Sequence, residues 1–415
     1  MSGPLQGIRV LELARILAGP WAGQLLADFG AEVIKVERPG VGDDTRRWGP
    51  PFLRDQQGRE TAESAYFLSA NRGKRSVAID FTRPEGADLV RQLAARSDVL
   101  IENFKVGGLA RYGLDWASLQ ASHPGLVYCS ITGFGQDGPR ARQAGYDAAI
   151  QAMGGLMSMT GLPDNVPGGG PQKVGVAVAD LMAGMYAANA IQAALLHRER
   201  TGQGQHIDLS LLDSQVAMLA NQAANYLVGG QSPKRLGTAH PNIVPYQAFA
   251  TADGHLMLAV GNDGQFARLA ALLGHPEWPV DERYASNAAR VQHRDLLVAQ
   301  LTECLKSGTT GEWLKQFEQA GIPAAPINDL AEVFGDPQVR HRQLVRELDH
   351  PMDAQLPSVA NPVRFSATPL VHDRAPPMLG ADSRQVLEQE LDLSAQQIDE
   401  LAGQGIIGVR SPATG

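Results

Sequence analysis

Residues 7–37, GIRVLELARILAGPWAGQLLADFGAEVIKVE, contain the alternation that determines the predicted fold. Ile8–Leu13 is predicted as a strand, Trp21–Phe29 as a helix that ends at Gly30, and Ala31–Glu37 as a second strand. A strand, a helix and a strand joined by short loops favour parallel pairing and a right-handed crossover. This stretch therefore predicts an α/β protein.

The same alternation continues along the first third of the chain, with further strands expected at Ser76–Phe81, Asp98–Glu102 and Leu126–Thr132 and a helix at Pro84–Arg96. We therefore expect an open doubly wound parallel sheet, which binds ligands beyond the carboxyl ends of its strands. Cationic, amide and glycine residues occupy those positions, and they suit a phosphate-bearing ligand. The segments are Ala14–Pro20, Arg38–Gly42, Thr82–Arg83, Asn103–Lys105 and Gly133–Gly135.

Composition narrows the class of protein. The 415 residues carry 36 basic and 44 acidic side chains, a net charge of −8, which argues against a bulk nucleic-acid or membrane-surface binder. The two cysteines, Cys129 and Cys304, cannot form a disulfide framework or a four-cysteine zinc site. No signal peptide or membrane span is recognisable, so we expect a cytoplasmic protein. The dinucleotide glycine fingerprint is absent after the first strand, which disfavours a nicotinamide or flavin enzyme.

The predicted domain organisation is a large domain interrupted by a smaller one. Residues 1–227 form the first part of the large α/β domain, with helices near Asp180–Arg200 and Leu211–Leu227. Residues 228–325 form an α+β domain with a hairpin of Tyr246–Thr251 and His255–Val260. Residues 326–415 return to complete the large domain; they are expected to be irregular, with a last helix near Ser383–Leu391.

Asp180 is the first candidate for chemistry, because it follows a run of small residues and opens the long helix. One interpretation is an ordinary N-cap. The other is a carboxylate that the helix dipole keeps ionised and that attacks an activated acyl group. The pattern alone leaves both open. Gly145-Tyr146-Asp147 begins another helix, with an ordinary cap aspartate as the simpler interpretation.

Basic residues concentrate in the first hundred positions, and their placement near strand ends favours anion binding over scattered surface charge. They are Arg38, Arg46, Arg47, Arg72, Lys74 and Arg75. The ten histidines show no metal-ligand spacing, so no metal site is expected. Ser130 lacks the flanking glycines of a nucleophile elbow, which disfavours a hydrolase triad.

Several segments together resemble the class III CoA-transferase (CaiB/BaiF) family. They are the segments beginning at Gly7 and at Gly30, Glu102-Asn-Phe, Gly145-Tyr-Asp, Val178-Ala-Asp-Leu and Arg374-Ala-Pro-Pro-Met-Leu-Gly. The resemblance implies transfer of CoA between carboxylic acids through an aspartyl intermediate. It implies a CoA thioester as substrate, no prosthetic group, and an interlocked homodimer of two ring-shaped chains.

Carried over by position, the resemblance makes Asp180 the nucleophile. It places CoA along Leu17, Ala18, Arg38, Ile79, Asn103, Phe104, Lys105, Arg111 and Tyr146. Formyl-CoA transferases of this family carry histidine and glutamine at the positions of Arg15 and Leu17, and a glycine run that is missing here. These departures argue against formate and oxalate as substrates.

Residues 42–52, GDDTRRWGPPF, and 237–249, GTAHPNIVPYQAF, resemble the branch that moves CoA from succinyl-CoA to a dicarboxylate such as glutarate. A second carboxylate on the acyl chain needs a cationic partner. Our hypothesis is that Arg15, Arg46 or His240 lies at the distal end of the acyl pocket. Gly261 and Asn262 are candidate donors to the tetrahedral oxyanion.

Two alternatives remain at this point. An α-methylacyl-CoA racemase of the same family would need a second acid/base group, and has histidine where this chain has Tyr146. A tyrosine with a pKa near about 10 is a poor base at neutral pH, which favours the transferase. A non-catalytic acyl-CoA binding protein would tolerate the loss of Asp180.

Overall fold

The computed structural model describes residues 3–371 and 374–410, and the chain divides into two compact units. The larger unit comprises residues 1–156, 174–228 and 338–415, and the smaller comprises 157–173 and 229–337. The smaller unit thus extends from 229 to 337, where the sequence suggested 228–325. It also takes in residues 157–173, which the sequence assigned to the larger domain.

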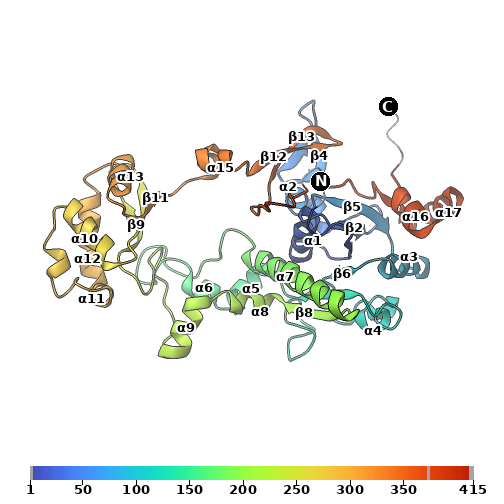
Figure 1. Ribbon diagram of the computed structural model, residues 1–415, viewed down its shortest axis with the longest axis horizontal. Helices are drawn as coiled ribbons and strands as arrows, with labels where there is room; N and C mark the ends of the chain where they lie inside the picture. Colours follow the sequence, from blue (N-terminus) through green and yellow to red (C-terminus); the bar gives the residue numbers. More distant parts are fainter. Residues whose placement is uncertain (1–2, 372–373, 411–415) are drawn as a thin grey trace. The chain divides into compact units, whose positions relative to one another are not determined.

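A seven-stranded sheet forms the centre of the larger unit (Figure 1). Its order is β14-β5-β2-β1-β6-β7-β8, and every neighbouring pair is parallel except β14 with β5. The strands are β1 (Arg9–Glu12), β2 (Glu32–Glu37), β5 (Lys74–Ile79), β6 (Val99–Glu102), β7 (Val127–Thr132), β8 (His206–Ser210) and β14 (Ile407–Gly408). The predicted parallel sheet is confirmed.

The strand order reverses between β1 and β6. From β1 the chain builds outward through β2 and β5, and then returns to the other side of β1 to add β6, β7 and β8. Loops that leave β1 and β6 at their carboxyl ends diverge to opposite faces of the sheet, and such a switch point opens a crevice. The order is the one that dinucleotide-binding sheets use, although the glycine fingerprint is absent.

Helices cover both faces of this sheet, as expected of a doubly wound fold. One face packs against α1 (Ala18–Asp28), α5 (Asp147–Met153), α7 (Val178–Thr201) and α8 (Leu211–Ala217). The other packs against α3 (Pro84–Ala95), α4 (Trp116–Leu119), α16 (Ser383–Leu391) and α17 (Ala395–Gly403). Alternate residues of β1 divide between the faces: Val10 belongs to the first core and Leu11 to the second.

The long helix α7 lies against α1 because small residues let the two backbones approach. The buried stripe of α7 is spaced four residues apart, at Ala179, Ala183, Ala187 and Ile191. A Cβ added at Gly184 would lie 2.7 Å from the carbonyl oxygen of Ala18. This close packing places the start of α7 beside the carboxyl end of β1.

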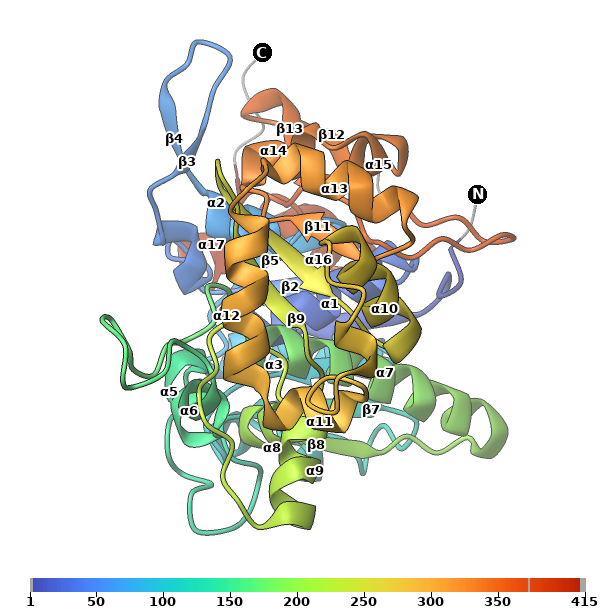
Figure 2. The same ribbon diagram turned by 90° about the vertical axis from the view of Figure 1, so that its left-hand side faces the viewer.

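The smaller unit contains a three-stranded antiparallel sheet in the order β11-β10-β9, covered by helices (Figure 2). The strands are β9 (Tyr246–Ala250), β10 (His255–Ala259) and β11 (Ala324–Pro326). The helices are α10 (Asp263–Leu272), α11 (Asn287–Gln292), α12 (Arg294–Leu305), α13 (Thr310–Gln319) and α14 (Leu330–Gly335). The predicted hairpin of β9 and β10 is confirmed. Strand β11 was not predicted, and the only local sequence feature beside it is Pro323, the residue that precedes it.

Two expectations were wrong. The helix expected over Leu211–Leu227 is divided into α8 and α9 (Ala220–Gly229), because Ala220 has a left-handed φ of 46° that interrupts the helix. The tail is not irregular, because β14 and a hairpin of β12 (Val345–His350) and β13 (Asp353–Val359) lie within it, and α16 is not its last helix, because α17 follows. The remaining elements are β3 (Phe52–Arg54), β4 (Glu60–Ser64), α2 (Ala65–Ser69), α6 (Leu156–Met159) and α15 (Pro337–His341), with short 3₁₀ turns at η1 (Asp44–Arg47), η2 (Ala110–Tyr112) and η3 (Trp278–Val280).

Candidate active site

A cavity of about 880 Å³ lies at the switch point of the large sheet, and all of its lining residues belong to the larger unit. Its wall comes from the segments that follow β1, β2, β5, β6 and β7, together with the start of α7. All nine residues suggested for CoA binding line it, as do Arg15 and Asp180. They are Leu17, Ala18, Arg38, Ile79, Asn103, Phe104, Lys105, Arg111 and Tyr146.

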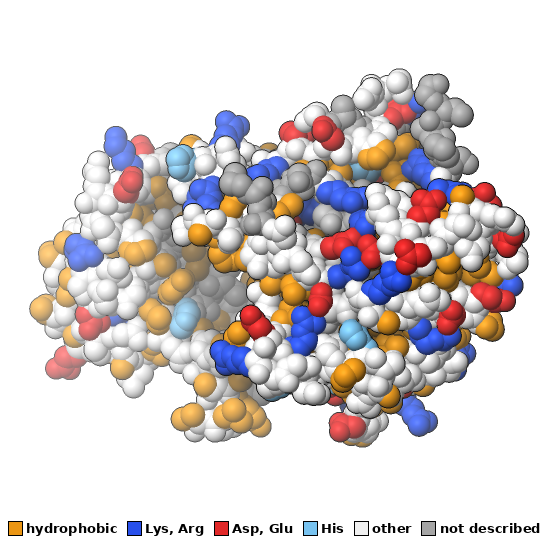
Figure 3. All heavy atoms as spheres, turned by 45° about the vertical axis from the view of Figure 1, so that its right-hand side comes forward, with side chains coloured by type: hydrophobic (Ala, Val, Ile, Leu, Met, Phe, Trp, Pro, Cys, Tyr) orange, Lys and Arg blue, Asp and Glu red, His pale blue; other side chains and the backbone are white. Residues whose placement is uncertain are grey.

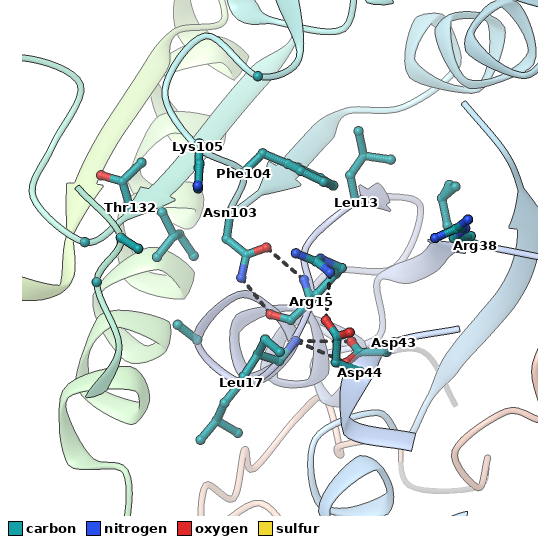
Figure 4. Close-up of a pocket in the computed structure, with 18 of the residues that line it drawn as sticks. Leu13, Arg15, Leu17, Arg38, Asp43, Asp44, Asn103, Phe104, Lys105 and Thr132 are labelled. Carbon is teal, nitrogen blue, oxygen red and sulfur yellow. Dashed lines mark hydrogen bonds and ion pairs between the residues drawn. The ribbon is translucent and has the colours of Figure 1, made fainter. Parts of the chain in front are cut away.

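The loop after β1 is held rigidly at the centre of this cavity (Figure 4). The Asn103 side chain accepts the Arg15 N–H at 2.9 Å and donates to the Arg15 carbonyl at 2.6 Å. The next N–H, of Ile16, donates to both carboxylate oxygens of Asp43 at 3.2 Å. Ile16 has a φ of 72°, a left-handed conformation that is strained for a β-branched residue. The surrounding side chains therefore impose this conformation on the loop.

A buried ionic network supports the loop from below. Lys35 Nζ contacts Glu12 at 2.9 Å, Asp43 at 3.0 Å and the carbonyl of Ala14 at 2.8 Å. Burial opposes the charge on Lys35, but Glu12 and Asp43 raise the pKa of its ammonium group. Lys74 Nζ lies 2.8 Å from Glu12, and burial lowers its pKa to about 8. A Cβ at Gly23 would lie 1.9 Å from Glu12 Oε2, so glycine is required where α1 crosses this network.

The six basic residues predicted near the strand ends differ in their role: four form a first group paired within the fold, Arg38 belongs to a second group at the cavity together with Lys105 and Arg111, and Arg47 is not among the residues that line the cavity. Arg46, Arg72, Lys74 and Arg75 each pair with a carboxylate of the fold: Glu37, Asp28, Glu12 and Glu32, respectively. Three other cations line the cavity with no carboxylate partner among the described residues. They are Arg38, Lys105 and Arg111. The first group stabilises the fold, and the second provides positive charge in the cavity.

Asp180 lies in the first turn of α7 but does not cap it. The helix begins at Val178 with Ala177 as its N-cap, so the N-cap interpretation of Asp180 was wrong. Asp147 caps the helix instead: its Oδ1 accepts the N–H groups of Ala179 at 2.8 Å and Asp180 at 3.3 Å. Asp147 is itself the first residue of α5 and does not cap its own helix. This cap leaves the Asp180 carboxylate free to face the cavity that it lines.

The Asp180 carboxylate is not held ionised at neutral pH, contrary to our expectation. Burial, with a smaller contribution from the negative charge of Asp147, raises its pKa to about 7. Among the described residues, none donates a hydrogen bond to this carboxylate. Because basicity and nucleophilicity increase together, a carboxylate with this pKa is a stronger nucleophile than an ordinary one once it loses its proton.

Tyr66 and Trp48 were not found from the sequence. Burial, followed by the negative charges of Asp180, Asp147 and Asp43, raises the pKa of the Tyr66 hydroxyl. The Trp48 ring lines the cavity and meets Tyr66 edge to face at 5.2 Å. Trp48 lies within residues 42–52, so the resemblance carried by that segment was the sequence signal that could have identified Trp48 as a site residue.

The three cations suggested for a distal carboxylate lie in different places. Arg15 lines the cavity and pairs with Asp44 at 2.7 Å. Arg46 does not line it: its guanidinium is buried between Glu37 and Glu63 and stacks over the Phe67 ring at 3.6 Å. We therefore withdraw Arg46 as an acyl-binding residue, because its hydrogen-bonding groups serve the fold. His240 belongs to the smaller unit, where its ring stacks on Tyr246 at 5.3 Å.

The suggested oxyanion donors also belong to the smaller unit. The N–H of Gly261 already donates to Gln265 Oε1 at 2.7 Å. The Asn262 side chain accepts the Gln265 N–H at 2.9 Å and so caps α10. Gly261 is thus a poor oxyanion donor, because its N–H has a partner within its own turn.

A second, smaller cavity of about 210 Å³ lies beyond β6, β7 and β8. Ser130 Oγ lies 2.9 Å from His206 Nε2 and hydrogen-bonds to Glu102. Burial raises the pKa of Glu102 to about 7, although its bonds from Ser130 and the Phe104 N–H oppose the shift. The Phe104 N–H donates to Glu102 Oε2 at 2.8 Å, so this carboxylate fixes the loop after β6.

No helix within the described ranges is long and apolar enough to cross a membrane. Residues 3–371 and 374–410 contain no group of three His, Cys, Asp or Glu side chains that could hold a metal ion. On the face shown in Figure 3, acidic and basic side chains are interspersed.

Known proteins resemble this chain over nearly its full length. Residues 5–383 match the model of CoA-transferase family III. A succinate–glutarate CoA-transferase of Agrobacterium fabrum is 55% identical over 93% of this chain and 95% of its own length. A mouse succinyl-CoA:glutarate CoA-transferase is 47% identical over 97% and 90%.

A solved structure of a CaiB/BaiF family protein also resembles this chain. The crystal structure of a CaiB/BaiF family protein from Brucella suis is 50% identical and superposes with a TM-score of 0.82. The match covers 94% of this chain and all of that one. With its sheet, its cavity and these relatives, the chain belongs to CoA-transferase family III and is a CoA-transferase that uses a CoA thioester as substrate.

Proposed function

We propose that this enzyme transfers CoA from succinyl-CoA to glutarate or a closely related dicarboxylate. The observation that carries the proposal is a single cavity at the switch point of the sheet, which brings together Asp180, the unpaired cations and Arg15. The names of the relatives from Agrobacterium fabrum and mouse support the donor and the acceptor. Cationic side chains suit the phosphates of CoA, and a guanidinium suits a distal carboxylate.

The proposed chemistry begins with attack by the Asp180 carboxylate on the thioester carbonyl of succinyl-CoA, which forms a mixed anhydride and releases CoA thiolate. The thiolate attacks the aspartyl carbonyl of the anhydride, which forms an aspartyl-CoA thioester and frees succinate. Glutarate then attacks this thioester to form a second anhydride, again releasing the thiolate. The thiolate attacks the glutaryl carbonyl and restores the Asp180 carboxylate.

The environment of Asp180 supports this role. Its raised pKa makes the carboxylate more basic than an ordinary aspartate, and its location inside the cavity keeps the thiolate close between steps. Carboxylates are weak nucleophiles, so holding the reactants in place supplies much of the acceleration, up to about 7–11 kcal/mol in favourable cases.

The proposed roles of the other residues follow from their position. Arg38, Lys105 and Arg111 bind the phosphates of CoA, and the adjoining Phe104 and Ile79 pack against its apolar parts. Arg15 binds the distal carboxylate of the acyl chain. Tyr146, which is 68% exposed at the cavity wall, contacts the CoA moiety and not a substrate α-proton.

A homodimer is part of the proposal. Apolar side chains at the end of α9 are widely exposed, with Leu227 at 79% and Val228 at 90%, and in α14 Leu330 is 73% exposed. Surfaces of this kind are normally covered by another protein. Light scattering during gel filtration should give twice the chain mass, and a monomeric mass at micromolar concentration would refute the dimer.

Trapping of the aspartyl intermediate tests the function. After incubation with succinyl-CoA and hydroxylamine, mass spectrometry should find a hydroxamate at Asp180 and at no other carboxylate. A racemase or a binding protein would form none. In a panel of carboxylic acids assayed with succinyl-CoA, we expect dicarboxylates of four to six carbons to be the best acceptors. Equal rates with monocarboxylates would refute the proposed acceptor class.

A further inference from the structure

Arg15 lines the cavity and, unlike Arg38, Lys105 and Arg111, already has a carboxylate partner among the described residues. Its Nη1 lies 2.7 Å from Asp44 Oδ2, and both side chains are about half exposed, at 49% and 44%. Figure 4 shows the Arg15 guanidinium between Asn103 and Asp44, at the middle of the cavity wall. We propose that Asp44 is a specificity-determining residue, an internal carboxylate that occupies the Arg15 site and must be displaced by the distal carboxylate of a dicarboxylic substrate. This inference rests on the proposed function.

The position of Arg15 is fixed independently of Asp44. Its backbone is held on both sides by Asn103, and the following residue is held by Asp43. The guanidinium carbon lies 5.6 Å from the centre of the Phe104 ring, a cation–π arrangement. The guanidinium therefore stays in the cavity when its carboxylate partner changes.

Asp44 differs from its neighbour Asp43 in how it is held. Asp43 is 2% exposed and accepts hydrogen bonds from both the N–H and the hydroxyl of Thr45. The only partner described for the Asp44 carboxylate is Arg15. An ion pair that is half exposed to water is weak, whereas the buried pair of Arg46 with Glu37 is not exchangeable. Asp44 can therefore move away from Arg15 without disturbing the fold.

The exchange is chemically matched. Displacement of Asp44 replaces one carboxylate on the guanidinium with another, so the charge of the occupied site stays the same. A ligand with an amide in place of the distal carboxylate cannot compete for Arg15 and leaves the pair intact. Asp44 thus lowers the affinity for dicarboxylates, which must displace it, and leaves the affinity for ligands without a distal charge nearly unchanged, so it sets how strongly the site prefers a distal carboxylate.

Substitution of Asp44 by asparagine tests the inference, with glutarate and its monoamide as probes. Asp44→Asn should lower the KM for glutarate about two- to fivefold, the size expected on release of one half-exposed ion pair. The inhibition constant of the monoamide should change less than twofold. In the Arg15→Ala background, Asp44→Asn should leave the glutarate KM where Arg15→Ala alone puts it. Asp44→Ser serves as a second variant with the same expected direction.

Asp80→Asn is the matched control, because Asp80 lines the same cavity and has no cationic partner among the described residues. It measures the effect that loss of any negative charge has on anion binding. A rise or no change in the glutarate KM of Asp44→Asn overturns the inference, since it would make Asp44 an orienting group. A fall confined to the KM for succinyl-CoA also overturns it and assigns Arg15 to a CoA phosphate. Absence of transfer to any dicarboxylate by the unmodified enzyme refutes the proposed function as well.

Discussion

Two carboxylates of the larger unit, Asp180 and Glu102, have a pKa of about 7 for the same first reason, which is burial. Their hydrogen bonds differ. Glu102 accepts from the Ser130 hydroxyl and the Phe104 N–H, whereas among the described residues none donates to the Asp180 carboxylate. The comparison teaches that a shifted pKa marks both a structural and a reactive group. Unused lone pairs that face a cavity distinguish the reactive one.

Removal of each carboxylate should give the largest contrast. Asp180→Asn should lower kcat more than about 10³-fold, because the amide that replaces the proposed nucleophile cannot form the anhydride. Glu102→Gln should lower it less than about tenfold, since the amide oxygen still accepts the Phe104 N–H. Steady-state transfer assays measure both, and calorimetry with CoA should show that Asp180→Asn still binds it. Similar losses of kcat in the two variants would contradict the distinction between a reactive and a structural carboxylate.

Glu12 extends the comparison to a carboxylate that is fully buried and forms ion pairs with two buried lysines, Lys35 and Lys74. Glu12→Gln leaves Lys35 and Lys74 without their shared counter-charge, so the free energy of unfolding should fall by about 3–5 kcal/mol. Urea denaturation measures the loss. Asp88→Asn, which breaks the exposed pair with Arg91 in α3, is the control and should change stability by less than about 0.5 kcal/mol.

Loss of Asp180 should also stabilise the protein. The folded-state pKa of Asp180 is raised from 3.8 to about 7, so the folded state binds more protons than the unfolded state between these values. Stability therefore decreases as pH rises through this window. Asp180→Asn removes this penalty. Its free energy of unfolding at pH 8 should therefore be about 1–3 kcal/mol higher than that of the unmodified enzyme. The difference should vanish at pH 3.5, and an advantage that persists there would point to another cause.

The smallest effect concerns Asp147, whose negative charge contributes to the raised pKa of Asp180. In the unmodified enzyme, kcat/KM should rise with pH through a midpoint near 7 as Asp180 loses its proton. Asp147→Asn keeps an oxygen to cap α7 but removes the charge, so the midpoint should move to lower pH. A pH–rate profile measures it. An unchanged midpoint together with a lower maximum would restrict Asp147 to capping.

Local patterns predicted the parts of the fold that depend on periodicity. The alternation over residues 7–37 predicted β1, α1 and β2, and Ser383–Leu391 matches α16 residue for residue. The sequence also contained a capping box at Ser394 and Gln397, a signal that would have indicated α17. The division of α8 from α9 could not be predicted, because alanine favours a continuous helix and gives no local signal for the left-handed φ of Ala220.

The site was predictable to the extent that topology determines it. Strand ends on one side of a parallel sheet converge, so Arg38, Asn103 and Lys105 could be placed near one another before any coordinates. Which cations are already paired could not be known, and Arg46 was misassigned for that reason. The cap that Asp147 provides for another helix joins residues 32 apart and has no local signature.

The antiparallel strand β14 has a consequence for the order of events during protein synthesis. Ile407 pairs with Ile79 on β5, the Arg46 guanidinium donates to the Pro377 carbonyl at 2.9 Å, and Asp382 accepts the Ser76 N–H at 2.8 Å. The edge of β5 is therefore closed by residues that leave the ribosome roughly three hundred positions later. Until then the nascent chain displays an open parallel edge, the kind of surface that pairs with other chains. Translation past position 407 is thus the step that ends the exposure of this edge to aggregation.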